Sequence, residues 1–159
     1  MSNKKMAIIA TKGTLDWAYP PFILASTAAA LGYEVQIFCT FYGLQLLKKK
    51  LKLSVSPLGN PGMPMPMGMD KWFPIIGTAL PGMQMIMTAM MKAKMKKKGI
   101  ASVEELRSIC IEADVKLIAC QMTVDLFDFK NSDLLDDIDY AGAATFLEFA
   151  GDTDINLYI

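Results

Sequence analysis

The residue best placed to do chemistry is Cys120, which follows a short apolar run, Val115–Ala119. A run of this length predicts a buried parallel strand. In open α/β sheets, ligands and reacting groups lie at the carboxyl ends of such strands. A thiol there can meet backbone N–H groups and the start of a helix, both of which lower its pKa from about 8.5 and favour the thiolate. A lone cysteine is more often a small buried hydrophobe, so position alone leaves both roles open.

The segment after Cys120 could stabilise a thiolate. Gln121, Met122 and Thr123 follow directly, and Thr123 is a suitable N-cap for a short helix. Their backbone N–H groups are the expected donors to the sulfur. Asp125 would raise the pKa of the thiol if its carboxylate lay beside it, so we expect this residue to be solvated or to cap a helix.

The other two cysteines, Cys39 and Cys110, give an odd total without the spacing of a metal site or of a disulfide framework. They are typical of the reduced thiols of a cytoplasmic protein. Cys39 directly follows the predicted strand Glu34–Phe38, so it should share a sheet edge with Cys120, without a stable disulfide to it. Cys110 falls on the apolar face of a helix that begins near Ser102, which predicts a packed and unreactive thiol.

Composition excludes several classes of function. The chain has 159 residues, which suits one domain with a sizeable core. It has no histidine, which removes His-based acid–base catalysis, Ser-His and Cys-His nucleophiles and most zinc or iron sites. The formal net charge is zero, so nothing global favours nucleic acid. The first apolar run is too short for a signal peptide. We therefore expect no metal, no cofactor and a cytoplasmic protein.

The elements that must position Cys120 alternate along the chain. Predicted strands alternate with predicted helices, which indicates βαβ units and a parallel sheet between two helical layers, in a flavodoxin-like or Rossmann-like topology. Pro20 and Pro21 should either start the first helix or kink it. The predicted strands are Lys5–Ala10, Glu34–Phe38, Val115–Cys120 and an edge strand Thr153–Ile159, and the predicted helices are Leu15–Leu31, Leu44–Leu51, one from Ser102, a short one from Asn131, and Tyr140–Gly151.

A methionine-rich insertion at about 54–98 interrupts this order. Ser54–Met69 is dense in proline and glycine and predicts an irregular loop. Trp72–Met91 has no formal charge and precedes a lysine cluster, so by length it passes for a membrane span, although prolines and glycines break it. A helix pair, buried or covered by other subunits, is the favoured interpretation, and membrane-surface contact is the alternative. Alternating thioethers could also hold Cu(I); these are Met63, Met65, Met67 and Met69.

Five segments together resemble one family. They are KGTLD (Lys12–Asp16), TFYGLQLL (Thr40–Leu47), ALPGM (Ala79–Met83), KKKGIASVEEL (Lys96–Leu106) and KLIACQMTVDLF (Lys116–Phe127). In this order they span most of the chain. The sequence resembles the DsrE/DsrF-like family of sulfur-trafficking proteins, in particular the DsrE-type sulfurtransferase branch also described as peroxiredoxin-like.

The resemblance implies an α/β sandwich, homo-oligomers, and a cysteine that carries sulfur as a persulfide, which maps onto Cys120. A second cysteine of some members maps onto Cys110, whereas Cys39 stands where an apolar or aromatic residue is expected. The implied partners are TusA-like or rhodanese-like sulfur-carrier proteins. Some members have membrane spans, for which only Trp72–Met91 qualifies here. Further residues of the matching segments are candidates to support the site: Lys12, Gly13, Thr40 and Tyr42.

Two other functions remain open from the sequence. One is a non-catalytic binding or scaffold module, whose cysteines are inert and whose methionine-rich segment recruits a partner or a membrane. The other is a thiol-redox protein that uses Cys120 with Cys39 or Cys110. The chain has no CxxC motif, which weakens the redox interpretation.

Overall fold

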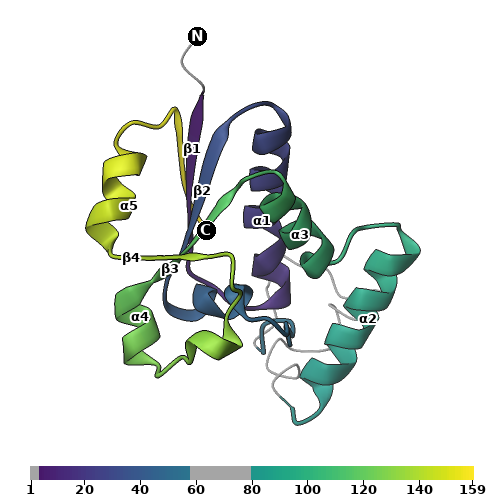
Figure 1. Cartoon of the computed structure of the whole chain (residues 1–159). Coiled ribbons are helices and arrows are strands. Elements are labelled where there is room, and N and C mark those ends of the chain that lie inside the picture. The colour runs from purple at the N-terminus through teal and green to yellow at the C-terminus, as the bar shows by residue number, and fades with distance from the viewer. Residues whose placement is uncertain (1–3, 58–79) are drawn as a thin grey trace. The chain divides into compact units, whose positions relative to one another are not determined.

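The computed structural model describes residues 4–57 and 80–159, and its sheet is built from five parallel strands in the order β4-β3-β2-β1-β5 (Figure 1). The strands are β1 (Lys5–Ala10), β2 (Glu34–Cys39), β3 (Lys116–Cys120), β4 (Asp139–Ala141) and β5 (Ile155–Tyr158). Within the described residues the helices are α1 (Leu15–Ala30), α2 (Met83–Lys97), α3 (Val103–Glu112), α4 (Gln121–Leu126) and α5 (Ala143–Ala150), and the 3₁₀ helices are η1 (Phe41–Leu47) and η4 (Asn131–Asp133).

The chain divides into two compact units. The first comprises the described residues of Met1–Gly13, Trp17–Lys52 and Val103–Ile159, and it contains the whole sheet. The second comprises Thr14–Asp16 and the described residues of Leu53–Ser102, which include α2. Cys120 and its surroundings belong to the first unit.

Helices cover both faces of the sheet in the first unit, as the alternation of elements predicts. α5 lies on one face and α1 and α3 on the other (Figure 1). Under α5, buried residues of three neighbouring strands pack against Phe146; these are Ala7, Phe38, Ile118 and Cys120. Successive side chains of a strand point to opposite faces, so Ile8, Ile37 and Leu117, all fully buried, face the layer of α1 and α3. The predicted α/β fold with a layered parallel sheet is confirmed.

Several predicted elements agree closely with the structure. The first strand has the predicted bounds, and Thr153–Ile159 contains β5, an edge strand that pairs with β1. α1 runs without interruption through Pro20 and Pro21, so the helix does not begin at the prolines.

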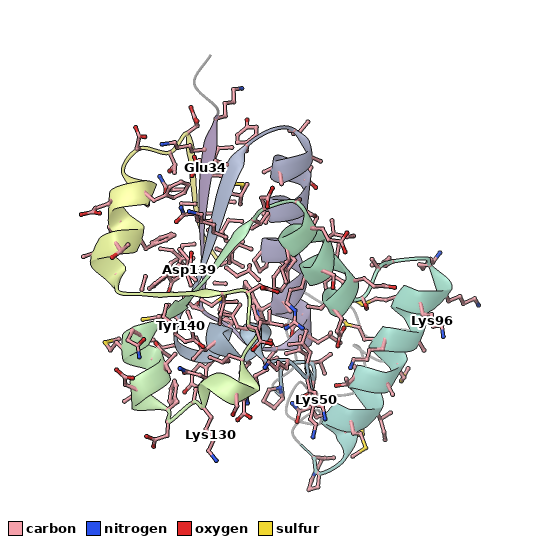
Figure 2. The ribbon with its side chains drawn as sticks, in the orientation of Figure 1. Glu34, Lys50, Lys96, Lys130, Asp139 and Tyr140 are labelled. Carbon is pink, nitrogen blue, oxygen red and sulfur yellow. The ribbon has the colours of Figure 1, made fainter. Side chains whose placement is uncertain are left out.

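One predicted helix is wrong, and another begins later than predicted. Leu44–Leu51 is not an α-helix: the 3₁₀ helix η1 ends at Leu47, and the extended Lys48 forms an antiparallel bridge with Leu134. This long-range pairing overrides local helix propensity. In the predicted helix Tyr140–Gly151, the first residues belong to β4, where Tyr140 pairs with Ala119, and α5 begins only at Ala143. A three-residue edge strand is too short to show a periodic pattern. Figure 2 labels Tyr140 and its neighbour Asp139 on this strand.

Helix α2 is not a buried helix within this chain. None of its residues is buried, and Met85 and Ile86 are 76% and 54% exposed. The Lys96 side chain projects outward from it (Figure 2). Among the described residues, no helix is both long enough and apolar enough to cross a membrane. Residues 72–79, the start of the apolar segment, and the alternating methionines at 63–69 lie outside the described residues.

Candidate functional site

Cys120 is the last residue of β3 and the N-cap of α4, with an extended backbone (φ −66°, ψ 111°). Its side chain is 4% exposed and belongs to the cluster under α5, with Phe38, Ile118 and Phe146. The predicted position, at the carboxyl end of a buried parallel strand and directly before a short helix, is confirmed. The sequence predicted Thr123 as the N-cap of this helix. That prediction is wrong, because Thr123 lies inside the helix.

Two threonine hydroxyl groups meet beside Cys120. Thr40 follows β2, and its Oγ1 lies 3.1 Å from Oγ1 of Thr123. The backbone N–H of Phe41 also donates to Thr123 Oγ1 over 3.2 Å. Thr123 is completely buried. Its two contacts join the loop after β2 to α4, although Thr40 and Thr123 are 83 positions apart in the sequence.

The pKa of the Cys120 thiol is set by opposing effects. Burial raises it, but donors from the hydroxyl groups of Thr123 and Thr40 and from the backbone N–H groups of Thr123 and Met122 favour the thiolate. The donors prevail, and the pKa of Cys120 lies below its ordinary value. Since the thiolate is the nucleophilic form of cysteine, this environment favours the nucleophilic form of Cys120.

The other two thiols have the opposite environment. Burial raises the pKa of Cys39 to about 12, although the nearby Arg107 guanidinium opposes this. Burial likewise raises the pKa of Cys110 to about 11; its thiol lies 3.4 Å from the carbonyl of Phe22, to which it donates. Both side chains are fully buried. The predicted packed position of Cys110 is confirmed.

Gln121, Met122 and Asp125, which follow Cys120 in the sequence, have exposed side chains. The side chains of Gln121 and Met122 are exposed, and the Gln121 amide donates to the Asp125 carboxylate over 2.8 Å. Met122 reaches the sulfur only through its backbone N–H. Asp125 is exposed, as expected for a solvated residue.

Of the other candidate residues, the structure brings Thr40 to Cys120. The Lys12 ammonium instead lies over the Trp17 ring, 3.1 Å from its centroid. Gly13 is packed so closely that a Cβ would overlap the carbonyl oxygen of Tyr42. Gly13 therefore acts through the backbone, by allowing the loops after β1 and β2 to approach each other. The Tyr42 ring is 66% exposed.

An aromatic cluster beside this site was missed by the sequence analysis. The Phe127 ring, at the end of α4, stacks with Tyr42 at 5.9 Å and contacts Phe41 and Phe129 edge-on at 6.2 and 6.4 Å. These rings border an open hollow of about 300 Å³. It is lined by Phe41, Tyr42, Gln45, Lys48, Phe127, Asp128, Phe129 and Asp133. The paired aromatics at 41–42 and 127–129 are visible in the sequence, but their contact depends on the pairing of β2 with β3.

Comparisons with known proteins agree with this fold and site. The model of the DsrE/DsrF/DrsH-like family matches residues 2–158. The sulfur carrier protein DsrE2 of Allochromatium vinosum is 76% identical over 159 residues, which cover the whole of both chains. The uncharacterized protein YrkE of Bacillus subtilis is 37% identical, over 99% of this chain and 98% of that protein.

A solved structure supports the fold alone. The ychN protein of E. coli is 10% identical and superposes with a TM-score of 0.53, over 98% of this chain and 99% of the other. The full-length match to the family model and the two full-length relatives establish the relationship: the chain belongs to the DsrE/DsrF/DrsH-like family.

Proposed function

We propose that this protein is a sulfur carrier that holds sulfane sulfur as a persulfide on Cys120. The observation that carries the proposal is the contrast among the three thiols: only Cys120 has a lowered pKa, whereas burial raises those of Cys39 and Cys110. The name of the 76% identical relative, sulfur carrier protein DsrE2, supports the same function.

The proposed transfer needs one thiolate and no acid–base pair. The Cys120 thiolate attacks the outer sulfur of a donor persulfide, R–S–SH, and a new S–S bond forms. The bond between the two donor sulfurs breaks, its electron pair leaves with R–S⁻, and the proton stays on the transferred sulfur. Delivery is the same exchange, with an acceptor thiolate as the attacking group. No external oxidant or reductant is consumed, and a chain without histidine can perform both steps.

The proposed partners are TusA-like or rhodanese-like proteins, which would supply or accept the sulfur, and further copies of this chain. A homo-oligomer would cover the exposed apolar side chains of α2, among them Met85 and Ile86, because exposed apolar surface often marks an interface. Contact of the segment 72–91 with a membrane surface is the alternative. We place the protein in the cytoplasm, where thiols stay reduced.

A thiol-redox function finds less support. Cys39 pairs with Ala119 in the sheet, so it points to the face opposite to that of Cys120. Both residues carry free thiols in the structure, as does Cys110. The sheet itself would separate the two sulfurs of a Cys39–Cys120 pair.

Mass spectrometry of the intact protein after exposure to polysulfide tests the proposal. Each bound sulfur atom should add about 32 Da, the mass of the element, and a thiol reductant should remove it. The added mass should be lost in Cys120→Ser and retained in Cys110→Ser, which controls for the loss of a thiol elsewhere. Uptake at the wild-type level by a folded Cys120→Ser protein would refute the function proposed for this residue. A dominant Cys39–Cys120 disulfide would instead indicate redox chemistry.

A further inference from the structure

We propose that the open hollow beside η1 and the end of α4 is a docking site for a cationic side chain, an arginine or a lysine, of the protein that exchanges sulfur with this chain. The role of that protein rests on the proposed function. The affinity of the hollow for a cation, in contrast, can be measured without any sulfur transfer.

The first argument is the set of aromatic rings that line the hollow. Tyr42 stacks on Phe127 at 5.9 Å, and Phe127 also meets Phe41 and Phe129 edge-on. Tyr42 nevertheless remains mostly exposed to solvent. The face of an aromatic ring attracts a cation that lies within about 6 Å of the ring centroid. The cluster itself contains one example, because the Lys48 ammonium lies 4.9 Å from the centroid of Phe129.

The second argument is the charge of the lining. Asp128 and Asp133 contribute two carboxylates and Lys48 one ammonium, so the lining is negative overall. Neither carboxylate forms a salt bridge with a lysine or arginine of the described residues, whereas Asp136 pairs with Lys49. Unpaired carboxylates beside aromatic faces favour an incoming cation over a neutral or anionic group.

The backbone around the hollow is also unusual. Of the three non-glycine residues with a positive φ in the described part of the chain, two line the hollow: Phe41, with φ +47°, and Asp128, with φ +50°. This conformation is rare for a bulky side chain such as that of Phe41. The hydrogen bond from the Phe41 N–H to Thr123 Oγ1 helps to hold it. Residues in such conformations cluster at ligand-binding and active sites, which agrees with a binding role for the hollow.

The third argument identifies a protein as the source of the cation. Exposed apolar side chains, Met122 and Leu126, lie on α4 between Cys120 and Phe127 in the sequence. They are four residues apart and so share one face of the helix. Aromatic residues and methionine are enriched at protein interfaces. A free small cation would leave these side chains in water, whereas a protein would cover them.

The fourth argument is the distance to the sulfur. Cys120 and Phe127 are the two caps of α4. A helix rises about 1.5 Å per residue, so roughly 10 Å separates these caps along the helix axis. About three residues of extended chain span this distance. One short segment of a partner could therefore place a cation in the hollow and bring its own cysteine to the Cys120 end of α4.

The test compares two peptides that differ only in charge. Each contains one cysteine and, three residues away, either arginine or citrulline, which has nearly the same shape but is neutral. In an NMR titration of the full chain, followed at the backbone N–H groups of Tyr42 and Phe127, the reduced arginine peptide should bind about three- to tenfold more tightly than the citrulline peptide. Tyr42→Leu and Asp128→Asn should each reduce this preference towards one.

Tyr140→Leu is the matched control. Tyr140 is an exposed aromatic residue of β4 that does not line the hollow (Figure 2), so this variant should keep the wild-type preference. Leucine at the exposed position 42 and asparagine at 128, which tolerates a positive φ, are expected to preserve the fold, and circular dichroism checks this.

Equal affinities of the two peptides for the wild type would overturn the inference, as would a preference that Tyr42→Leu retains. N-acetylarginine amide should bind much more weakly than the arginine peptide, and equal binding would reject a partner protein in favour of a small cation. The persulfidated arginine peptide then tests sulfur transfer, in which its outer sulfur moves to the Cys120 thiolate and the peptide thiolate leaves. Selective binding without transfer would uphold the docking site and reject the proposed function, so the two can fail separately.

Discussion

Cys39 and Cys120 end adjacent parallel strands, yet their side chains lie on opposite faces of the sheet. Cys39 is paired with Ala119, the residue before Cys120, so the alternation of side chains along β3 places the two sulfurs on different sides. Cys120 belongs to the cluster under α5. The Cys39 thiol lies close enough to Arg107 of α3 for the positive charge of the guanidinium to oppose the rise in its pKa. A shared sheet edge therefore does not give the two thiols a shared environment.

This difference predicts the order of alkylation. At pH 8, iodoacetamide should label Cys120 in the folded protein well before Cys39 or Cys110, because burial holds the pKa values of these two at about 12 and 11. In urea all three should react at similar rates. Peptide mass spectrometry of a time course measures each site in one sample, and the unfolded protein serves as the control. Equal labelling of Cys110 and Cys120 in the folded state would contradict the assignment of the nucleophile.

The same two buried thiols predict how stability depends on pH. Burial raises their folded-state pKa values to about 12 and 11, so above the ordinary thiol pKa of about 8.5 the unfolded chain releases protons that the folded chain retains. The stabilisation is complete below about pH 8.5 and is lost as pH rises towards 11 and 12. Each thiol should contribute a slope of about 1.4 kcal/mol per pH unit in this range.

Urea unfolding at several pH values between 8 and 11 measures this dependence, with the double variant Cys39→Ala/Cys110→Ala as the comparison. Lysines also titrate in this range, so the informative quantity is the difference between the two proteins. The variant should be less stable at pH 8 and should lose less stability than the wild type on going to pH 11. Parallel curves for the two proteins would show that the buried thiols do not couple to folding.

Gly43 allows η1 to pack against the end of β1. A Cβ at this position would overlap the carbonyl oxygen of Ala10, which is rigid backbone. Gly43→Ala should therefore lower the free energy of unfolding by about 2–4 kcal/mol, as overpacking does when neither side can move. It should also slow the alkylation of Cys120, since η1 follows Thr40.

Gly142→Ala is the matched control, because a Cβ there meets nothing within 4 Å and the φ of Gly142 is −84°. Its free energy of unfolding should stay within about 0.5 kcal/mol of the wild type, or rise slightly, because alanine reduces the entropy of the unfolded chain. Similar losses in both variants, measured by chemical denaturation, would show that close packing of Gly43 is unimportant.

Arg107, a residue of α3, anchors the end of η1 through hydrogen bonds. One nitrogen of its buried guanidinium, Nη1, donates to the carbonyl oxygens of Leu46 and Lys48 over 2.8 and 2.7 Å. Arg107→Met keeps the apolar part of the side chain but leaves both carbonyls without this partner. The expected loss of stability is about 2–4 kcal/mol.

An exposed ion pair provides the comparison for Arg107. The Lys49 ammonium and the Asp136 carboxylate lie 2.8 Å apart, and the two side chains are 41% and 82% exposed. Asp136→Ala should lower the free energy of unfolding by less than about 1 kcal/mol, because exposed pairs contribute little. A loss in Arg107→Met no greater than in Asp136→Ala, in the same denaturant series, would refute the role given to the buried guanidinium.

The sequence by itself determined the parallel α/β fold and the place of Cys120 in it. The apolar runs of β1 and β3 are local patterns, and the alternation of strands with helices allows few other topologies. The apolar face of α3 likewise marked Cys110 as a packed residue. These features depend on residues that are neighbours along the chain, and for that reason they can be read without coordinates.

Only the tertiary structure decided what surrounds the sulfur. Thr40 and Thr123 are 83 positions apart and meet because β2 pairs with β3 in one particular register. The same register places Cys39 on the far face of the sheet from Cys120. Strand β4 exists through its pairing with β3, since its three residues carry no periodic signal of their own. Contacts of this kind are set by the packing of distant segments, which local propensity does not encode.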